Sequence, residues 1–155
     1  PTLDAPTRAI REPLRDLVSA ELLMGRAPSL PKELPPGYAL QEITAVSYPD
    51  LPSWISQPFF VELAYGKSGE TPGLRLREYR LLFREYGGIK GIQPASDLVA
   101  SFEAVDVSGA PGTLLTFARG EAKHTVIWER DGLLLELETD RLSTEQLLEV
   151  AQTVR

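Results

Sequence analysis

The sequence predicts an α+β fold, a mainly antiparallel, curved, half-barrel-like sheet of about six to seven strands with an N-terminal and a C-terminal helix. Three observations predict it. Short β-type segments separated by Gly, Pro and Asp turns fill residues 38–138, a helical pattern precedes them, and a capped helical pattern follows. The 155 residues suit one folded unit.

A helix and a linker are expected in residues 1–36. Between Arg8 and Met24, apolar side chains recur at spacings of three and four, which is typical of an amphipathic helix. Glu12-Pro13 predicts a break or the true start of this helix near Pro13, because proline is best tolerated in the first turn. The residues of this apolar stripe are Ile10, Leu14, Leu17, Val18, Leu22 and Leu23. Gly25 is a candidate C-cap, and four prolines make residues 27–36 an extended linker.

The α+β domain is expected at residues 37–155, where seven segments are strand candidates. They are 38–46, 59–65, 74–84, 101–107, 113–118, 123–129 and 133–138. The third segment also fits helical spacing, but it leaves a loop of hairpin type, so we predict a strand. Asp131-Gly132 predicts a tight hairpin, because both residues tolerate positive φ.

A capping box predicts where the C-terminal helix begins. Ser143 can accept a hydrogen bond from the backbone N–H of Gln146, whose side chain can reach back to the N–H of Ser143. The apolar stripe behind this cap consists of Leu147, Leu148, Val150, Ala151 and Val154. Trp128, on the strand before the last hairpin, is expected in the core.

The composition excludes several kinds of function. A net charge of −6 and a pI near 4.9 argue against nucleic acid as a partner, because that affinity depends on Lys and Arg. The absence of cysteine excludes disulfides and thiolate catalysis. With one histidine, no acidic ligand loop and no glycine-rich fingerprint, we expect no metal and no cofactor.

The location of the protein is suggested only indirectly. The sequence contains no run of about 18 apolar residues, which is the length needed to span a membrane. Pro1 does not initiate a translated chain, so we expect that a signal or anchor has been removed. Thirteen prolines, no Asn and one Met match part of a thermophile composition, which makes a thermophilic source a hypothesis.

The single histidine, His124, is the only candidate catalytic base of its type. Ser101, Ser108 and Asp106 could partner it, but no spacing couples them, and we expect a solvent-facing histidine at a strand edge. We therefore predict that the protein is not an enzyme. A hydrolase that uses His124 with a serine is the minor alternative.

Charged residues on two strands are further candidates. Glu136 and Glu138 alternate with leucines and precede Asp140, and we expect a solvated sheet face rather than a catalytic pair. Arg75 and Arg77 share one strand face and could bind a carboxylate-rich peptide or an anionic lipid headgroup. The alternative is an exposed face on which Glu78 and Glu85 pair with these arginines.

Aromatic residues beside a Pro-rich stretch form the second group of candidate ligand contacts. They are Tyr48, Trp54 and Phe59, with Phe60 next to them. A loop this apolar is either buried or an exposed patch that marks a binding site.

The C-terminal third carries an ordered set of motifs. Gly109 lies in a turn before the segment 113–117, and Val126-Ile127-Trp128 and Asp131-Gly132 follow. Leu142-Ser143-Thr144-Glu145-Gln146-Leu147-Leu148 then leads into Val150-Ala151. In this order, and in Pro35-Pro36-Gly37-Tyr38, the chain resembles a bacterial domain of unknown function that recurs in extracytoplasmic parts of anti-sigma factors and in envelope lipoproteins.

The resemblance implies a non-catalytic module on the outer side of a membrane. We expect a cell-envelope binding or sensory domain with a protein, peptide or lipid partner. The alternative is a carrier of a lipid or other hydrophobic ligand, which requires a sheet face too apolar for two helices to fill. The sequence leaves open whether the helix at Arg8–Met24 packs on its own domain or is swapped onto a neighbour, which would make a dimer.

Overall fold

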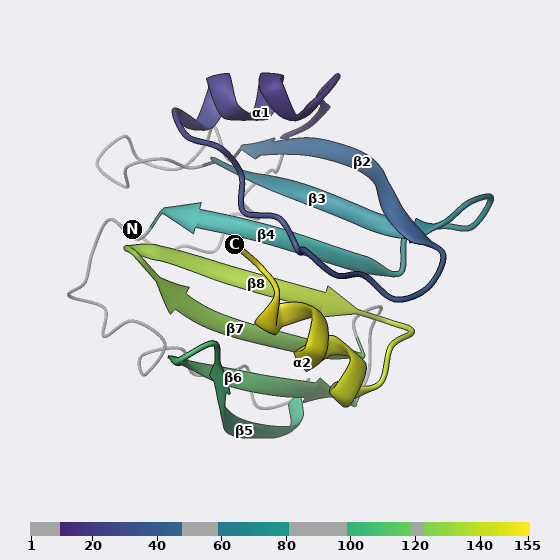
Figure 1. Ribbon diagram of the computed structural model, residues 1–155, viewed down its shortest axis with the longest axis vertical. Coiled ribbons are helices and arrows are strands. Elements are labelled where there is room, and N and C mark those ends of the chain that lie inside the picture. The colour runs from purple at the N-terminus through teal and green to yellow at the C-terminus, as the bar shows by residue number, and fades with distance from the viewer. Residues whose placement is uncertain (1–9, 48–58, 81–98, 119–122) are drawn as a thin grey trace, which may run out of the picture.

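A computed structural model of the chain describes residues 10–47, 59–80, 99–118 and 123–155. In these residues, eight strands form one antiparallel sheet that does not close into a barrel, and two helices lie on one of its faces (Figure 1). The strands pair in the order β1-β2-β3-β4-β8-β7-β6-β5. The predicted antiparallel sheet with two helices is confirmed, but the strand count exceeds the predicted six to seven.

The bounds of the elements follow the predicted segments closely from β2 onward. The strands are β1 (Ile10–Pro13), β2 (Tyr38–Ser47), β3 (Phe59–Lys67), β4 (Leu74–Arg80), β5 (Val99–Val107), β6 (Ala110–Phe117), β7 (His124–Arg130) and β8 (Leu133–Thr139). The helices are α1 (Leu17–Met24) and α2 (Thr144–Gln152). The ambiguous third segment is a strand over Leu74–Arg80, as predicted, and its residues 81–84 lie outside the described residues.

The predicted helix does not extend back to Arg8, and the predicted break near Pro13 is confirmed. Ile10–Pro13 is the additional strand, and it pairs with β2 at the edge of the sheet. The helix begins later because the Asp16 carboxylate accepts the backbone N–H of Ser19 at 2.8 Å and so caps its first turn. It ends where predicted, at Gly25, whose φ of 75° suits a residue without a side chain.

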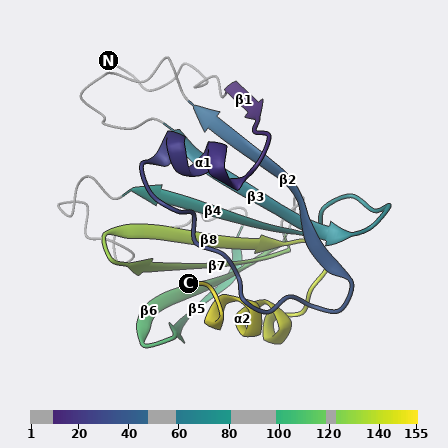
Figure 2. The same cartoon turned by 45° about the horizontal axis from the view of Figure 1, so that its top comes forward.

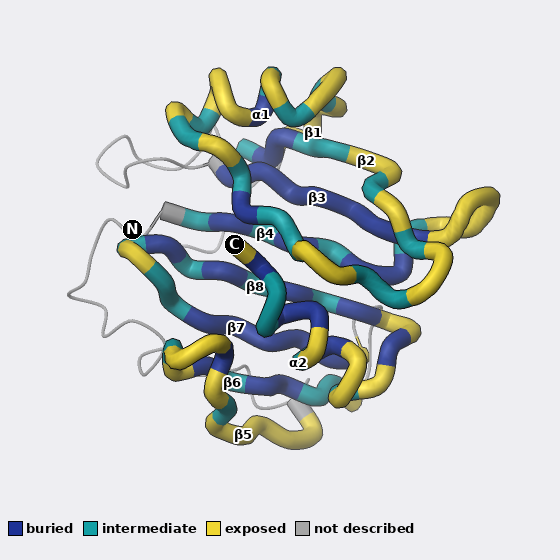
Figure 3. The backbone as a smooth tube through the Cα atoms, in the orientation of Figure 1, coloured by how far each residue is buried: buried dark blue, intermediate teal, exposed yellow. Residues whose placement is uncertain are grey.

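The predicted apolar stripe is only partly correct, because Leu14 and Leu17 pack against the core whereas Val18, Leu22 and Leu23 do not. Ala20 faces the core and is fully buried, because a small side chain lets the helix approach the sheet closely. Val18 and Leu23 are exposed, and Leu22 is 80% exposed. Most of α1 is coloured as exposed in Figure 3. The helix does pack in cis, since it contacts β2 and β3 of its own chain.

The core lies between the helices and the sheet. One row of directly opposed residues crosses five strands from β6 to β3: Leu114, Val126, Leu137, Leu76 and Leu63. The capping box at Ser143 is present as predicted, and it orients α2 so that Leu147, Val150 and Ala151 cover this face. Trp128 is buried in the same core, as predicted.

The linker after α1 crosses the helix-bearing face beside the C-terminal residues (Figure 2). Leu30 and Arg155 exchange two backbone hydrogen bonds, each of 3.0 Å. The Ser29 hydroxyl donates to the buried Glu78 carboxylate at 2.8 Å, and Arg26 forms an ion pair with the same carboxylate. These contacts hold the linker against β4.

Two tight hairpins have the predicted turn chemistry. Asp131 and Gly132 both have positive φ, 51° and 77°, between β7 and β8. Ser108 and Gly109 have φ of 52° and 86° between β5 and β6. Two successive positive φ values match the twist of the flanking strands, which fixes the register of both hairpins.

Candidate ligand-binding site

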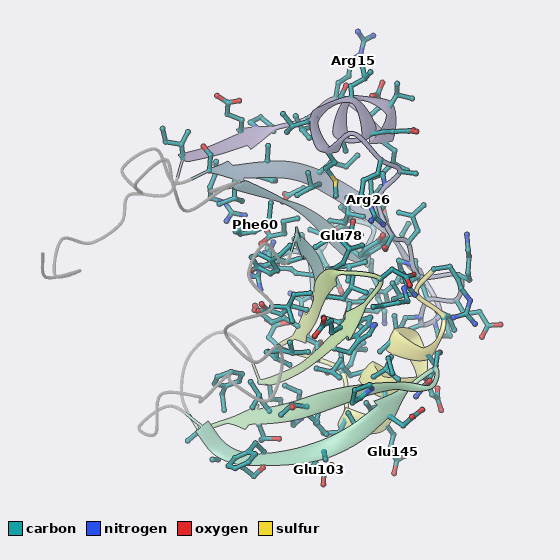
Figure 4. The ribbon with its side chains drawn as sticks, turned by 90° about the vertical axis from the view of Figure 1, so that its left-hand side faces the viewer. Arg15, Arg26, Phe60, Glu78, Glu103 and Glu145 are labelled. Carbon is teal, nitrogen blue, oxygen red and sulfur yellow. The ribbon has the colours of Figure 1, made fainter. Side chains whose placement is uncertain are left out.

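The face of the sheet away from the helices, here the distal face, carries most of the paired charges. Figure 4 shows Phe60 on this side of the sheet and Glu78 with Arg26 on the helix side. Six side chains form the charge cluster, three basic and three acidic: Arg11, Glu62, Arg75, Arg77, Glu136 and Glu138. The strand register brings them together, because Glu136, Arg77 and Glu62 lie directly opposite one another on β8, β4 and β3.

Arg77 is the centre of the charge cluster. Its Nε lies 2.7 Å from Glu62 Oε2, and its Nη1 lies 3.0 Å from Glu136 Oε1 and 2.6 Å from Glu138 Oε2. Only 16% of the side chain is exposed. Burial alone would lower the pKa of Arg77, but the hydrogen bond and charge of Glu138, with the charges of Glu136 and Glu62, raise it above its ordinary value.

The pKa values of two carboxyl groups in the cluster move in opposite directions. Glu62 is 2% exposed; burial pushes its pKa up, but Arg77 and Arg11 outweigh burial and bring it below the ordinary value. Burial is also the largest influence on the pKa of Glu136. Together with the negative charge of Glu138 it outweighs the charge of Arg77, so the pKa of Glu136 is raised. The two carboxyl groups therefore have different protonation behaviour on one sheet face.

The prediction of a solvated face is wrong for Glu136 and Glu138. Both side chains are largely buried, and both form ion pairs with Arg77, which lies between them and Glu62. Asp140 is exposed. The expected shared face of Arg75 and Arg77 is confirmed by the register.

Glu78 is not the partner predicted as the alternative for these arginines. The two-residue period of β4 turns it to the helix face, where it binds Ser29 and Arg26. Glu85, the other partner in that alternative, lies outside the described residues.

A polar pocket of about 350 Å³ opens beside the cluster at one end of β4 and β8. It is lined by Thr71, Pro72, Gly73, Arg75, Glu138, Thr139 and Asp140. Arg75 is 32% exposed, and its only ion pair among the described residues is a 3.3 Å contact from Nη1 to Glu62. A guanidinium has five N–H donors, so Arg75 retains donors that a ligand in the pocket could use.

The wall of the pocket is held by the buried hydroxyl of Thr139. It donates to the Gly73 carbonyl at 2.7 Å and accepts the backbone N–H groups of Arg141 and Leu142 at 3.1 and 3.0 Å. These bonds tie the β3–β4 loop to the turn before α2. The pocket is thus formed by the fold before any ligand binds.

The predicted aromatic contacts are not brought into this site by the described residues. Tyr48 and Trp54 lie outside them, and Phe59 is described only as the first residue of β3, opposite Ser47. Phe60 packs on the distal face against Tyr79, with ring centroids 4.6 Å apart.

The prediction of a solvent-facing His124 at a strand edge is wrong. The residue is buried, because β7 lies between β6 and β8, and its Nδ1 is 3.2 Å from Thr116 Oγ1. Burial lowers its pKa, and the charge of Lys123 adds to the effect. His124 lies opposite Thr116 on β6, which in turn lies opposite Ser101 near the start of β5. Asp106 and Ser108 lie at the far end of β5, where the Ser108 hydroxyl donates to the Gln152 carbonyl, so they do not form a catalytic set with His124.

Comparison with known family models, with curated proteins and with solved structures finds no match. The resemblance of the C-terminal third to the envelope-domain family therefore stays a prediction. Neither described helix has the length and apolar character needed to cross a bilayer. Within the described ranges, no three His, Asp or Glu side chains gather as metal ligands.

Proposed function

We propose that the chain is a non-catalytic binding or sensory domain of the cell envelope, as the extracytoplasmic part of a sigma-factor regulator or as a lipoprotein. Its ligand is a peptide with a carboxylate, which Arg75 binds in the polar pocket. The observation that supports this proposal is the partly exposed guanidinium of Arg75 in a preformed pocket. Arginine and carboxylate form two parallel hydrogen bonds when their planes align.

The other charges of the pocket favour a peptide over a lipid surface. Glu138 and Asp140 line the same pocket as Arg75. They would repel a surface of phosphate headgroups, and the net charge of −6 adds to that repulsion. The same carboxylates can accept hydrogen bonds from the main-chain N–H groups of a peptide, so donors and acceptors of both partners are matched.

The charge cluster supports a binding role for Arg75 rather than a reaction. Arg77 uses its donors on three carboxylates, and Glu62 is bound by three arginines. Arg75 and Glu138 are the cluster members that also line the pocket, and Arg75 is the basic one of the two. The ion pair between Glu62 and Nη1 of Arg75 orients the guanidinium at the pocket.

A direct binding assay tests the proposal. The probe is a rhodamine-labelled peptide of alternating valine and threonine whose single acidic group is its free C-terminal carboxylate, and its binding is followed by fluorescence polarisation. Arg75→Gln should weaken binding about tenfold to hundredfold, the loss expected for a hydrogen bond to a charged group. Arg15→Gln is the matched control, because it removes the same charge from an exposed position on the α1 side (Figure 4).

Two outcomes would overturn the proposal. One is equal binding by Arg75→Gln and the wild type, and the other is no measurable binding of the peptide to either. Native mass spectrometry of protein purified from its own host separates the carrier alternative, since a bound mass equal to a lipid would favour a carrier.

A further inference from the structure

The two edges of the sheet differ in how they are protected. β1 has four residues and ends at Pro13, which cannot donate a backbone hydrogen bond. β5 has nine residues, Val99–Val107, and contains no proline, lysine or arginine. Short strands, prolines and lysines are the usual means of preventing edge pairing. The β1 edge uses these means, whereas β5 has a register irregularity between Val99 and Ser101 and a regular register from Ser101 onward.

The outer edge of β5 is also open to solvent. The strand order ends at β5, so among the described strands only β6 pairs with it. Residues 100–104 are all exposed (Figure 3). Phe102 projects from the distal face and is 67% exposed, although Leu115 beside it on β6 is buried. Among the described residues, the edge therefore offers backbone groups without a strand partner next to an apolar side chain.

We propose that β5 pairs antiparallel with β5 of a second copy of this chain, so that one sheet continues across a two-fold symmetric dimer. The proposed register places Phe102 opposite the partner's Phe102. Ala100 then lies opposite the partner's Ala104, and Ser101 opposite the partner's Glu103. Cross-strand aromatic pairs stabilise antiparallel strands, and this register has no like charges in direct opposition.

The neighbouring registers are less favourable. Moving the two-fold axis one residue towards the C-terminus sets Glu103 directly against the partner's Glu103, and moving it two residues that way sets Phe102 against the partner's Asp106. Moving it one residue towards the N-terminus sets Phe102 against the partner's Ala100 and loses the aromatic pair. The sequence of this strand thus favours the register centred on Phe102.

The assembly closes at two copies. A two-fold contact uses the same edge of both chains and leaves only the two β1 edges at the ends of the joined sheet. Each β1 edge is short and carries Pro13, so further chains are not added. The protein should be a dimer rather than a fibre.

A single introduced cysteine tests the pairing and its register, because the chain has no cysteine of its own. In the proposed dimer the two copies of residue 102 have Cα atoms about 4.5–5.5 Å apart, which a disulfide can bridge. Phe102→Cys should therefore form a disulfide-linked dimer under mild oxidation. Ala104→Cys is the matched control, on the same face of the same strand, but its two copies would lie roughly 14 Å apart.

Sedimentation equilibrium of the full chain gives the second measurement. The wild type should be a dimer, and Phe102→Glu should shift it to a monomer, because two carboxylates would then face each other. Circular dichroism checks that this exposed substitution leaves the fold intact. A wild type that is monomeric at all concentrations, a dimer that persists in Phe102→Glu, or cross-linking of Ala104→Cys as fast as Phe102→Cys would each overturn the proposal.

Discussion

Arg77→Met tests whether the charge cluster contributes to the stability of the fold. Methionine has a similar length and fills irregular space, so the change removes the charge with little loss of packing. It leaves Glu136 and Glu138 without the cation that lies within 3.0 Å of both. Glu62 keeps its contacts with Arg11 and Arg75.

The expected loss of stability follows from the burial of the cluster. Removing one partner of a buried ion pair costs about 3–5 kcal/mol. Arg77 keeps 16% of its side chain exposed, so we expect the lower end, about 3 kcal/mol. For a chain of this size that corresponds to a melting midpoint lower by roughly 6–12 °C. Arg75→Gln is the control, and it should cost less than about 1 kcal/mol because its ion pair is longer and more exposed.

Urea unfolding at two pH values measures this effect. Burial already raises the folded-state pKa of Glu136 above its ordinary value, and the variant removes the Arg77 charge that opposes this rise, so protonation of Glu136 relieves the penalty as the pH falls. The difference between wild type and variant should therefore be smaller near pH 5 than near pH 7. A loss below about 1 kcal/mol at neutral pH, or a difference that does not change with pH, would refute this account.

Two other residues give predictions of the same kind. Thr139→Val should cost about 3 kcal/mol in urea unfolding, because the Gly73 carbonyl and two backbone N–H groups lose their partner, whereas Thr139→Ser keeps the hydroxyl and should cost about 1 kcal/mol. His124 has a folded pKa below its ordinary value, so its contribution to stability is present above about pH 6.5 and is lost as the pH falls through the folded pKa. His124→Gln should lose less stability than the wild type between about pH 7.5 and 5.5, and equal losses would contradict this prediction.

Local patterns predicted most of the sheet. Asp131-Gly132 specifies a hairpin by itself, and the capping box at Ser143 specifies a helix start. The N-terminal segment was harder, because apolar residues with this spacing lie both on the core side (Leu14, Leu17) and on the exposed side (Val18, Leu22). Pro13 correctly indicated a break, and Asp16 was available in the sequence as a cap signal.

The charge cluster could be predicted only in part. The two-residue period of a strand placed Arg75 and Arg77 on one face correctly. Their partners Glu136 and Glu138 come from β8, and Arg77 and Glu138 are 61 positions apart in the sequence. Glu62, between Val61 and Leu63, was a usable signal, because a glutamate in an apolar strand is rarely buried without a cation.

The pairing of the linker with the C-terminal residues has a consequence for the order of folding. Lys32 bonds Thr153, 121 positions further along the chain, and Leu30 bonds Arg155. Contacts between segments so distant in sequence form slowly, because the intervening chain must lose much of its freedom first. The hairpins β5–β6 and β7–β8 can form early, but the linker can dock only after residues 153–155 are in place. We expect the helix-bearing face of the sheet to be the last part of the core to close.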